Sequence, residues 1–102
     1  MRIVKPSTLR EFWQCYPHAQ AALIRWREVV NAAQWESIAD VRRTLPHADL
    51  VTVRSGRVVV VFNIAGNHYR LIAAIHYNKR VVYVLKILTH SEYSADRWKE
   101  KL

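Results

Sequence analysis

The sequence predicts an α+β fold in which helices cover one face of a mostly antiparallel sheet. Two observations support this prediction. Apolar side chains in the first half recur every three to four residues, which is typical of amphipathic helices. The second half is instead rich in Val, Ile and Tyr between short turns, which is typical of strands. Because helices come first and strands follow, we expect the two kinds of element to form the two layers of a sandwich.

The N-terminal half is predicted to contain one strand and three helices. Thr8 is followed by Glu11 at the spacing of a capping box, which predicts that the first helix opens at Thr8. Pro17 ends that helix because proline lacks a backbone N–H. Apolar residues at helical spacing then predict a longer second helix and a short third one. These elements are expected at residues 2–5 (strand), 8–16, 18–34 and 37–44 (helices).

The C-terminal half is predicted to be a four-stranded meander with a short helix after it. Turns containing Gly, Asn or Lys separate the apolar segments. Ser94 is expected to cap the last helix, over residues 95–102. Together with the N-terminal strand, the meander would give a sheet of four to five strands in a single domain spanning residues 1–102. The strands of the meander are expected at residues 50–54, 57–64, 68–77 and 80–88.

The composition limits the classes of function. A chain of 102 residues can bury a core without a disulfide or a structural metal. Cys15 is the only cysteine and the C-x-x-C and H-E-x-x-H patterns are absent, so we expect no metal, no cofactor and a reducing, cytoplasmic location. No segment approaches the roughly 18 uncharged residues of a membrane span, so no membrane partner is expected.

The charge favours an anionic partner. Sixteen Lys and Arg against eight Asp and Glu give a formal net charge of +8. Such a balance points to nucleic acid first and to an acidic protein second, with simple solubility as the alternative explanation. Eleven of the sixteen cations are Arg, whose planar fork of donors suits phosphate. We therefore expect a nucleic-acid partner.

Alternation along residues 68–77 places Arg70 on the sheet face that the helices leave open. If the next turn has three residues, Arg70 lies opposite Lys86, and His76 lies opposite Arg80. A two-residue turn would remove both pairs. Like charges directly opposite one another are unfavourable, so the first register favours an anion between Arg70 and Lys86.

Further basic or polar side chains would extend this open face into a strip. Arg57 lies on the preceding predicted strand, Asn67 lies in the turn beside Arg70, and Arg80 follows the next turn. Arginine can donate two parallel hydrogen bonds to a phosphate. We therefore predict that Arg57, Asn67 and Arg80 contact RNA, with His90 and Tyr93 at the end of the strip.

Two spaced motifs resemble the HigB-type toxins of bacterial toxin-antitoxin pairs, within the RelE-like superfamily. The motifs are FNIAGNHYRL (62–71) and LTHSEYS (88–94), and the family commonly has Asp where Ser94 stands here. The resemblance implies a RelE-like two-layer sandwich and a metal-independent toxin that cleaves mRNA on the ribosome. It also implies a helix-turn-helix (HigA-like) antitoxin as partner. The matching positions are Asn63, Gly66, Asn67, Arg70, Thr89, His90, Glu92 and Tyr93.

Metal-free RNA cleavage defines the roles that these residues would fill. A base takes the 2′-hydroxyl proton, cations stabilise the pentavalent phosphorane, and an acid protonates the leaving 5′-oxygen. We expect Arg70 to hold the scissile phosphate and Lys86 to act as a second cation. His90 suits either proton-transfer role because imidazole titrates in the physiological range. Tyr93 suits an acid or a stacking platform, so the assignment of base and acid stays open.

Structural explanations compete with these roles. His90 can be a turn residue, and Tyr93 can pack on the terminal helix. The other histidines, at positions 18, 47, 68 and 76, are interpreted as surface or edge residues, and the four tryptophans as core. At the level of function, the alternatives are a non-catalytic RNA- or ribosome-binding module and a small basic protein-interaction domain.

Overall fold

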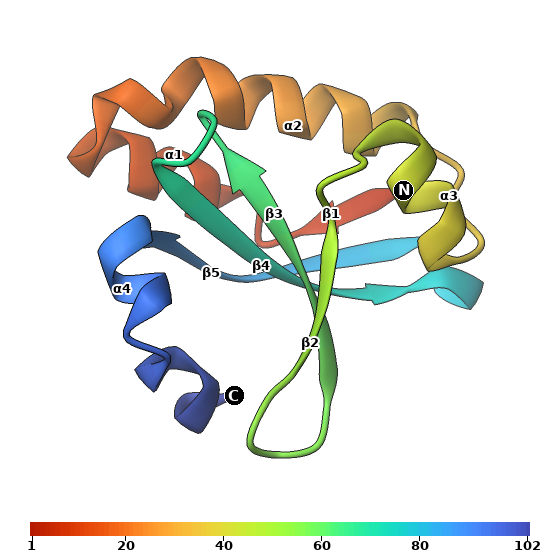
Figure 1. The fold of residues 1–102 in the computed structure, drawn as a ribbon. Helices are drawn as coiled ribbons and strands as arrows, with labels where there is room; N and C mark the ends of the chain where they lie inside the picture. Colours follow the sequence, from red (N-terminus) through yellow and green to blue (C-terminus); the bar gives the residue numbers. More distant parts are fainter.

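The computed structural model describes residues 1–102 and confirms the α+β architecture (Figure 1). Its sheet has five strands in the order β1-β5-β4-β3-β2, with β1 parallel to β5 and all other neighbours antiparallel. The N-terminal strand therefore joins the meander along its last strand. The strands are β1 (Arg2–Val4), β2 (Asp49–Thr52), β3 (Val58–Ile64), β4 (Tyr69–His76) and β5 (Val81–Thr89).

Helices lie on both sides of this sheet. In Figure 1, α1 (Ser7–Cys15) and α2 (Gln20–Ala32) run along one side, whereas α4 (His90–Ser94) and the C-terminus lie on the other. The short α3 (Ile38–Thr44) connects α2 to β2, and a 3₁₀ turn, η1 (Pro17–Ala19), connects α1 to α2. None of the helices is both long enough and apolar enough to span a bilayer. The main core between helices and sheet includes Leu9, Leu23, Trp26, Val30, Phe62, Leu71 and Val82.

The sheet face away from α1 and α2 is not open, contrary to the sequence-based expectation. Trp98, on the 3₁₀ helix η3 (Arg97–Lys101), is 4% exposed and forms a second apolar cluster on this face. The backbone N–H of Arg54 also donates to the carbonyl of Lys99 (3.0 Å). Burial of the apolar outer-face residues provides the driving force for this cover. The strand residues of the cluster are Val59, Val61, Ile72 and Leu88.

The capping prediction for the first helix is wrong. α1 begins at Ser7 after Pro6, whose φ of −64° already suits a helix, and no side chain caps it. The prediction that Ser94 caps a final helix is also wrong, because Ser94 is the last residue of α4.

The capping box lies instead at the end of β5. The N–H of Glu92 donates to Thr89 Oγ1 (3.2 Å), and the N–H of Thr89 donates to Glu92 Oε1 (2.9 Å). Two backbone donors at the start of α4 are thereby satisfied. α4 consequently begins directly where β5 ends, and this fixes the position of the side chains that follow Thr89.

The β4–β5 turn is longer than either predicted alternative. It contains the 3₁₀ turn η2 (Tyr77–Lys79) and Arg80, which has a positive φ of 55°. His76 consequently pairs with Val81, and the predicted pairing of His76 with Arg80 is wrong.

A β-bulge between Ile72 and Ala73 shifts the same ladder again. Arg70 lies opposite Leu88, and Lys86 lies opposite Ile72, so the predicted direct pairing of Arg70 with Lys86 is wrong. The four-residue turn alone would have placed Lys86 on the opposite face from Arg70. The bulge adds one residue to β5 and reverses that change of face. Lys86 therefore stays on the face of Arg70, at a diagonal position with a Cα separation of roughly 7–8 Å.

Candidate active site

Arg70 is the only charged residue in the buried set, with 8% of its surface exposed. Its Nη1 donates to the carbonyl of Tyr69 (3.0 Å) and its Nη2 to Asn67 Oδ1 (2.5 Å). Neither of the two ion pairs of the molecule includes Arg70. Because guanidinium has five N–H donors and buried charges are normally paired, the remaining donors are available for an anion.

The β3–β4 turn positions this guanidinium. Ala65 and Gly66 have φ values of 53° and 67°, as in the tight hairpin turns that need two successive left-handed residues. This conformation brings Asn67 back to accept from Arg70. Asn63 lies directly opposite Arg70 on β3. The predicted association of Asn67 with Arg70 is therefore present in the structure.

Tyr93, on α4, lies over the same guanidinium. The Cζ of Arg70 is 5.5 Å from the centroid of the Tyr93 ring, which also stacks on Trp98 (5.4 Å, 20°). Burial raises the pKa of the Tyr93 phenol, and nearby Asp49 adds to the rise, whereas the positive charges of Lys99 and Arg70 oppose it. The phenol is therefore protonated at neutral pH and can donate a proton or a hydrogen bond.

His47 also lies near Arg70, although the sequence analysis left it out of the site. Burial lowers the pKa of its imidazole, and the charge of Arg70 lowers it further. A neutral imidazole can accept a proton. The sequence contains one signal for this placement: His47 is two residues before Asp49, which pairs with Val61 on β3. Continuing that ladder by one step on the same face brings residue 47 level with Asn63.

His90 lies at the edge of this arrangement. Its backbone N–H donates to the carbonyl of His68 (2.9 Å), which ties the start of α4 to the β3–β4 turn. The residue is exposed, and its imidazole makes no hydrogen bond within the protein. The structure thus places the His90 backbone against the β3–β4 turn. The role of His90 in proton transfer stays a prediction.

Lys86 lines a neighbouring cavity of about 260 Å³ under α4 and η3. Two further cations, Arg97 and Lys101, line the same cavity together with Glu92. The sequence analysis did not include Arg97 and Lys101, because it predicted a regular helix there with no known orientation. The three cations extend the positive charge from Arg70 toward the C-terminus.

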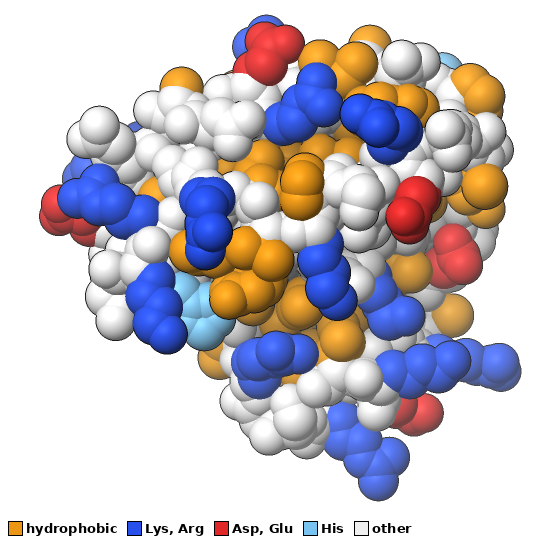
Figure 2. Space-filling view, turned by 180° about the vertical axis from the view of Figure 1, so that it is seen from behind, with side chains coloured by type: hydrophobic (Ala, Val, Ile, Leu, Met, Phe, Trp, Pro, Cys, Tyr) orange, Lys and Arg blue, Asp and Glu red, His pale blue; other side chains and the backbone are white.

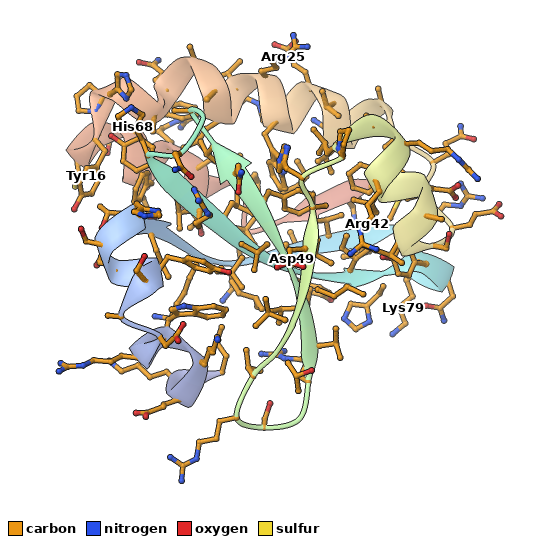
Figure 3. The ribbon with its side chains drawn as sticks, viewed as in Figure 1. Tyr16, Arg25, Arg42, Asp49, His68 and Lys79 are labelled. Carbon is orange, nitrogen blue, oxygen red and sulfur yellow. The ribbon has the colours of Figure 1, made fainter.

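Arg57 and Arg80 lie elsewhere, so the predicted continuous basic strip is wrong. Arg57 is in the β2–β3 turn, six residues and roughly 20 Å along β3 from Asn63. Arg80 is in the turn at the far end of β4. Figure 3 shows His68, next to Asn67, and Lys79, next to Arg80, at opposite sides of the molecule. The roles of Arg57 and Arg80 in RNA binding stay predictions.

Cations are spread widely over the rest of the surface. Figure 2 shows the face seen from behind, where Lys and Arg side chains surround a hydrophobic patch and form no single stripe. Positive charge alone therefore does not locate the site. The buried guanidinium of Arg70, with Tyr93, His47 and Asn67 around it, is the feature that distinguishes one region from the others.

Comparisons with known proteins show which family the chain resembles. Residues 19–96 match the family described as HigB_toxin, the RelE-like toxic component of a toxin-antitoxin system. The chain is also similar to the mRNA interferase toxin HigB of Escherichia coli strain K12 and to the mRNA interferases HigB of Escherichia coli O157:H7 and Shigella flexneri. Each is 20% identical over 93 residues, which cover 91% of this chain and 88% of the relative. The family match confirms the resemblance drawn from the two motifs.

Proposed function

The chain belongs to the HigB family of RelE-like toxins, and on this basis we propose that it is an endoribonuclease that cleaves mRNA. The names of its relatives, mRNA interferases, support this activity. The observation in the structure that carries the proposal is the buried Arg70 without an acidic partner. Such a group is destabilising unless an anion binds it, and the phosphate of RNA is an anion that matches its donors.

The proposed reaction needs no metal ion. His47 accepts the 2′-hydroxyl proton, and the 2′-oxygen then attacks phosphorus. Arg70 stabilises the negative charge of the phosphorane, and Tyr93 gives its proton to the 5′-oxygen as the P–O5′ bond breaks. The products are a 2′,3′-cyclic phosphate and a 5′-hydroxyl, and water returns the proton from His47 to Tyr93. The pKa directions of His47 and Tyr93 suit a base and an acid respectively.

His90 is the alternative base, as the sequence suggested. His90 is exposed and follows directly after β5, the strand that also carries Lys86. Substitution of His47 and of His90 by Gln, one at a time, separates the two assignments. The true base is the one whose removal abolishes the dependence of the cleavage rate on pH below 7.

The proposed context is translation. We propose that the substrate is mRNA on the ribosome. We also propose that a helix-turn-helix antitoxin of the HigA type neutralises the toxin, and that the toxin acts in the cytoplasm. Family membership supports the antitoxin. The cations Lys86, Arg97 and Lys101 offer a path for the RNA backbone beside the cavity that they line.

Expression of the protein alone tests the activity. We expect growth arrest and new 5′-ends within coding regions when transcript ends are mapped before and after induction. In purified reactions, the upstream product should carry a 2′,3′-cyclic phosphate and cleavage should survive EDTA, apart from any effect on ribosomes themselves. Soluble, folded protein that produces no new ends would leave a non-catalytic RNA- or ribosome-binding module, or a basic protein-interaction domain, as the function.

A further inference from the structure

The C-terminal part of β5 has no neighbouring strand on one of its two sides. β1 pairs only with Val81–Tyr83, whereas β5 continues to Thr89 (Figure 1). β1 ends where Lys5 takes a positive φ of 61° and the chain turns into α1. The segment Val84–Leu88 is therefore an unpaired sheet edge, which we call the free edge of β5, and it is long enough to pair with a short strand.

The ladder with β4 shows which backbone groups the free edge presents. The N–H of His90 donates to the carbonyl of His68, and bonded pairs recur at every second residue of an antiparallel ladder. Leu88 is consequently bonded to β4, and Ile87 directs its N–H and carbonyl away from β4. Thr89 also points its N–H outward, which is why this group can donate to the capping carboxylate of α4. Ile87 has no such partner, so it offers one donor and one acceptor to an added strand.

A groove of about 260 Å³ lies beside the free edge on the α1 side of the sheet. Tyr16 in its wall is 38% exposed and stacks on Phe12 (4.6 Å, 19°), so this part of the wall is preformed. A side chain of an added strand that faces α1 would enter the groove, and four of the six lining residues are apolar. The lining residues are Thr8, Glu11, Phe12, Cys15 and Tyr16 of α1 and Ile87 of β5.

The opposite face of the same edge is basic. Alternation places Lys86 on the face away from α1. Arg97 and Lys101 line the cavity that Lys86 also lines. Glu92 is the one carboxylate in that lining, and it is engaged in the capping box of α4. Three cations against one engaged carboxylate make this side of the edge complementary to acidic side chains.

We propose that the free edge of β5 binds an extended segment of a partner protein in which apolar and acidic side chains alternate. The proposal rests on the proposed function for the identity of the partner, which is then the antitoxin. Hydrogen bonds to the backbone of Ile87 add the segment to the sheet as a strand. Its apolar side chains enter the groove beside Tyr16, and its acidic side chains meet Lys86. A segment bound in this way excludes RNA from Lys86.

Two other occupants fit the free edge less well. RNA has no ladder of alternating donors and acceptors in its backbone, and its phosphates gain nothing from the apolar groove beside Tyr16. A second copy of the chain, paired edge to edge, would bring the cations around Lys86 toward those of its partner, in a protein whose formal net charge is already +8. An acidic and apolar strand is the occupant that matches both faces of the edge.

The probe is a capped synthetic peptide of alternating Val and Glu, about seven residues long. One control peptide has Lys in place of Glu, and a second has N-methylated Val amides, which cannot donate. Amide hydrogen exchange of the purified protein is measured by NMR. We expect the Val-Glu peptide to slow exchange at Ile87 about tenfold or more and to change Leu88, already bonded to β4, much less. Both control peptides should bind at least about fivefold more weakly.

Two pairs of variants test the two faces of the edge. Cys15→Tyr fills the groove, and its control Gln14→Tyr is on the same helix but does not line the groove. Lys86→Glu reverses the charge beside the edge, and its control Lys79→Glu lies in η2, at the other end of the sheet. Cys15→Tyr and Lys86→Glu should each weaken peptide binding about fivefold or more, whereas both controls should bind like the unmodified protein. Thermal unfolding shows which variants remain folded, and only folded members of a pair are compared.

The outcomes decide between the occupants. No slowing at Ile87, or equal binding of the Glu and Lys peptides, refutes the proposal. Protection of Ile87 by a single-stranded oligonucleotide and not by the peptide assigns the edge to RNA. Protection of Ile87 in the protein alone, with a dimer in sedimentation, assigns the edge to a second copy. Both of these results overturn the proposal.

The same measurements separate the docking surface from the activity. If the protein cleaves mRNA but the peptide leaves exchange at Ile87 unchanged, the docking surface is refuted and the ribonuclease function stands. If the peptide protects Ile87 while no mRNA is cleaved, the docking surface stands and the ribonuclease function fails.

Discussion

Replacing Arg70 by Met should nearly abolish activity and should not destabilise the protein. Methionine keeps most of the length of the side chain but carries no charge and no donors. The loss of one well-placed donor at a developing oxyanion typically costs about 3–4 kcal/mol, or two to three orders of magnitude in rate. Arg70 is 8% exposed beneath Tyr93, so solvent screens this contribution little.

The effect on stability follows from the same burial. An unpaired buried ion costs several kcal/mol of desolvation even after relaxation. Against this, Arg70 donates two hydrogen bonds, worth about 1 kcal/mol each, and lies over the Tyr93 ring, worth about 1 kcal/mol. The difference leaves the free energy of unfolding of Arg70→Met about 1 kcal/mol higher, which raises Tm by roughly 4–8 °C in a domain of this size.

The assay combines single-turnover RNA cleavage with urea and thermal unfolding of the same preparation. Arg43→Met is the matched control, because Arg43 is exposed and its ion pair with Asp40 contributes little. A folded Arg70→Met protein with full activity would remove Arg70 from the site. A loss of more than about 2 kcal/mol of stability would show that Arg70 anchors the β3–β4 turn instead.

Four further variants test individual contacts. Thr89→Ala should lower the free energy of unfolding by about 1 kcal/mol in urea, because it removes the cap of α4. Ala65→Gly should raise it by about 0.5–1 kcal/mol, because φ is 53° at this position. Folding lowers the pKa of His47, so the unfolded chain takes up a proton on this residue at a higher pH than the folded protein does. The free energy of unfolding therefore decreases as the pH falls below about 6.5. His47→Gln should flatten unfolding free energy against pH between about 7 and 5, and slow cleavage at least a hundredfold. Tyr93→Phe should slow cleavage with little change in Tm, since the ring still stacks on Trp98. An unchanged rate would exclude the phenol as the acid.

The sequence predicted most elements and the packing of the two main helices on one sheet face, because both depend on local periodicity. Alternation in β4 correctly placed Arg70 on the face away from α1 and α2. The register of β4 and β5 could not be predicted, because it depends on a turn and a bulge whose cost is small and whose sequence signal is weak. Arg80 adopts a left-handed conformation, which glycine usually occupies, so the sequence gives no sign of the turn at this position. The predicted pairing of Arg70 with Lys86 failed for this reason alone.

The cover over the outer face was harder to predict than the sheet itself. Val59, Val61 and Ile72 are apolar on that face, which indicated that something buries them. The sequence analysis instead treated the face as open, because it expected only the two main helices to cover the sheet. The last eight residues, which include three cations, were given no place on it. His47 was missed for a related reason: it lies outside any regular element and approaches Arg70 only through tertiary structure.

The apolar cover and Arg70, the proposed catalytic cation, depend on one another. Trp98 packs on the outer face and holds Tyr93 by stacking and by its indole hydrogen bond, and Tyr93 in turn covers Arg70. Lower exposure reduces the local dielectric, which strengthens the attraction between Arg70 and a phosphate but also increases the cost of the empty site. That cost acts on the segment from α4 to the C-terminus, which is attached to the sheet side by one small apolar cluster and by two backbone hydrogen bonds, His90 to His68 and Arg54 to Lys99. Binding of an anion removes the cost, so phosphate should stabilise the packing of this segment against the sheet. In the proposed mechanism, the apolar residues beneath Trp98 therefore contribute to catalysis, because they keep the charge of Arg70 buried.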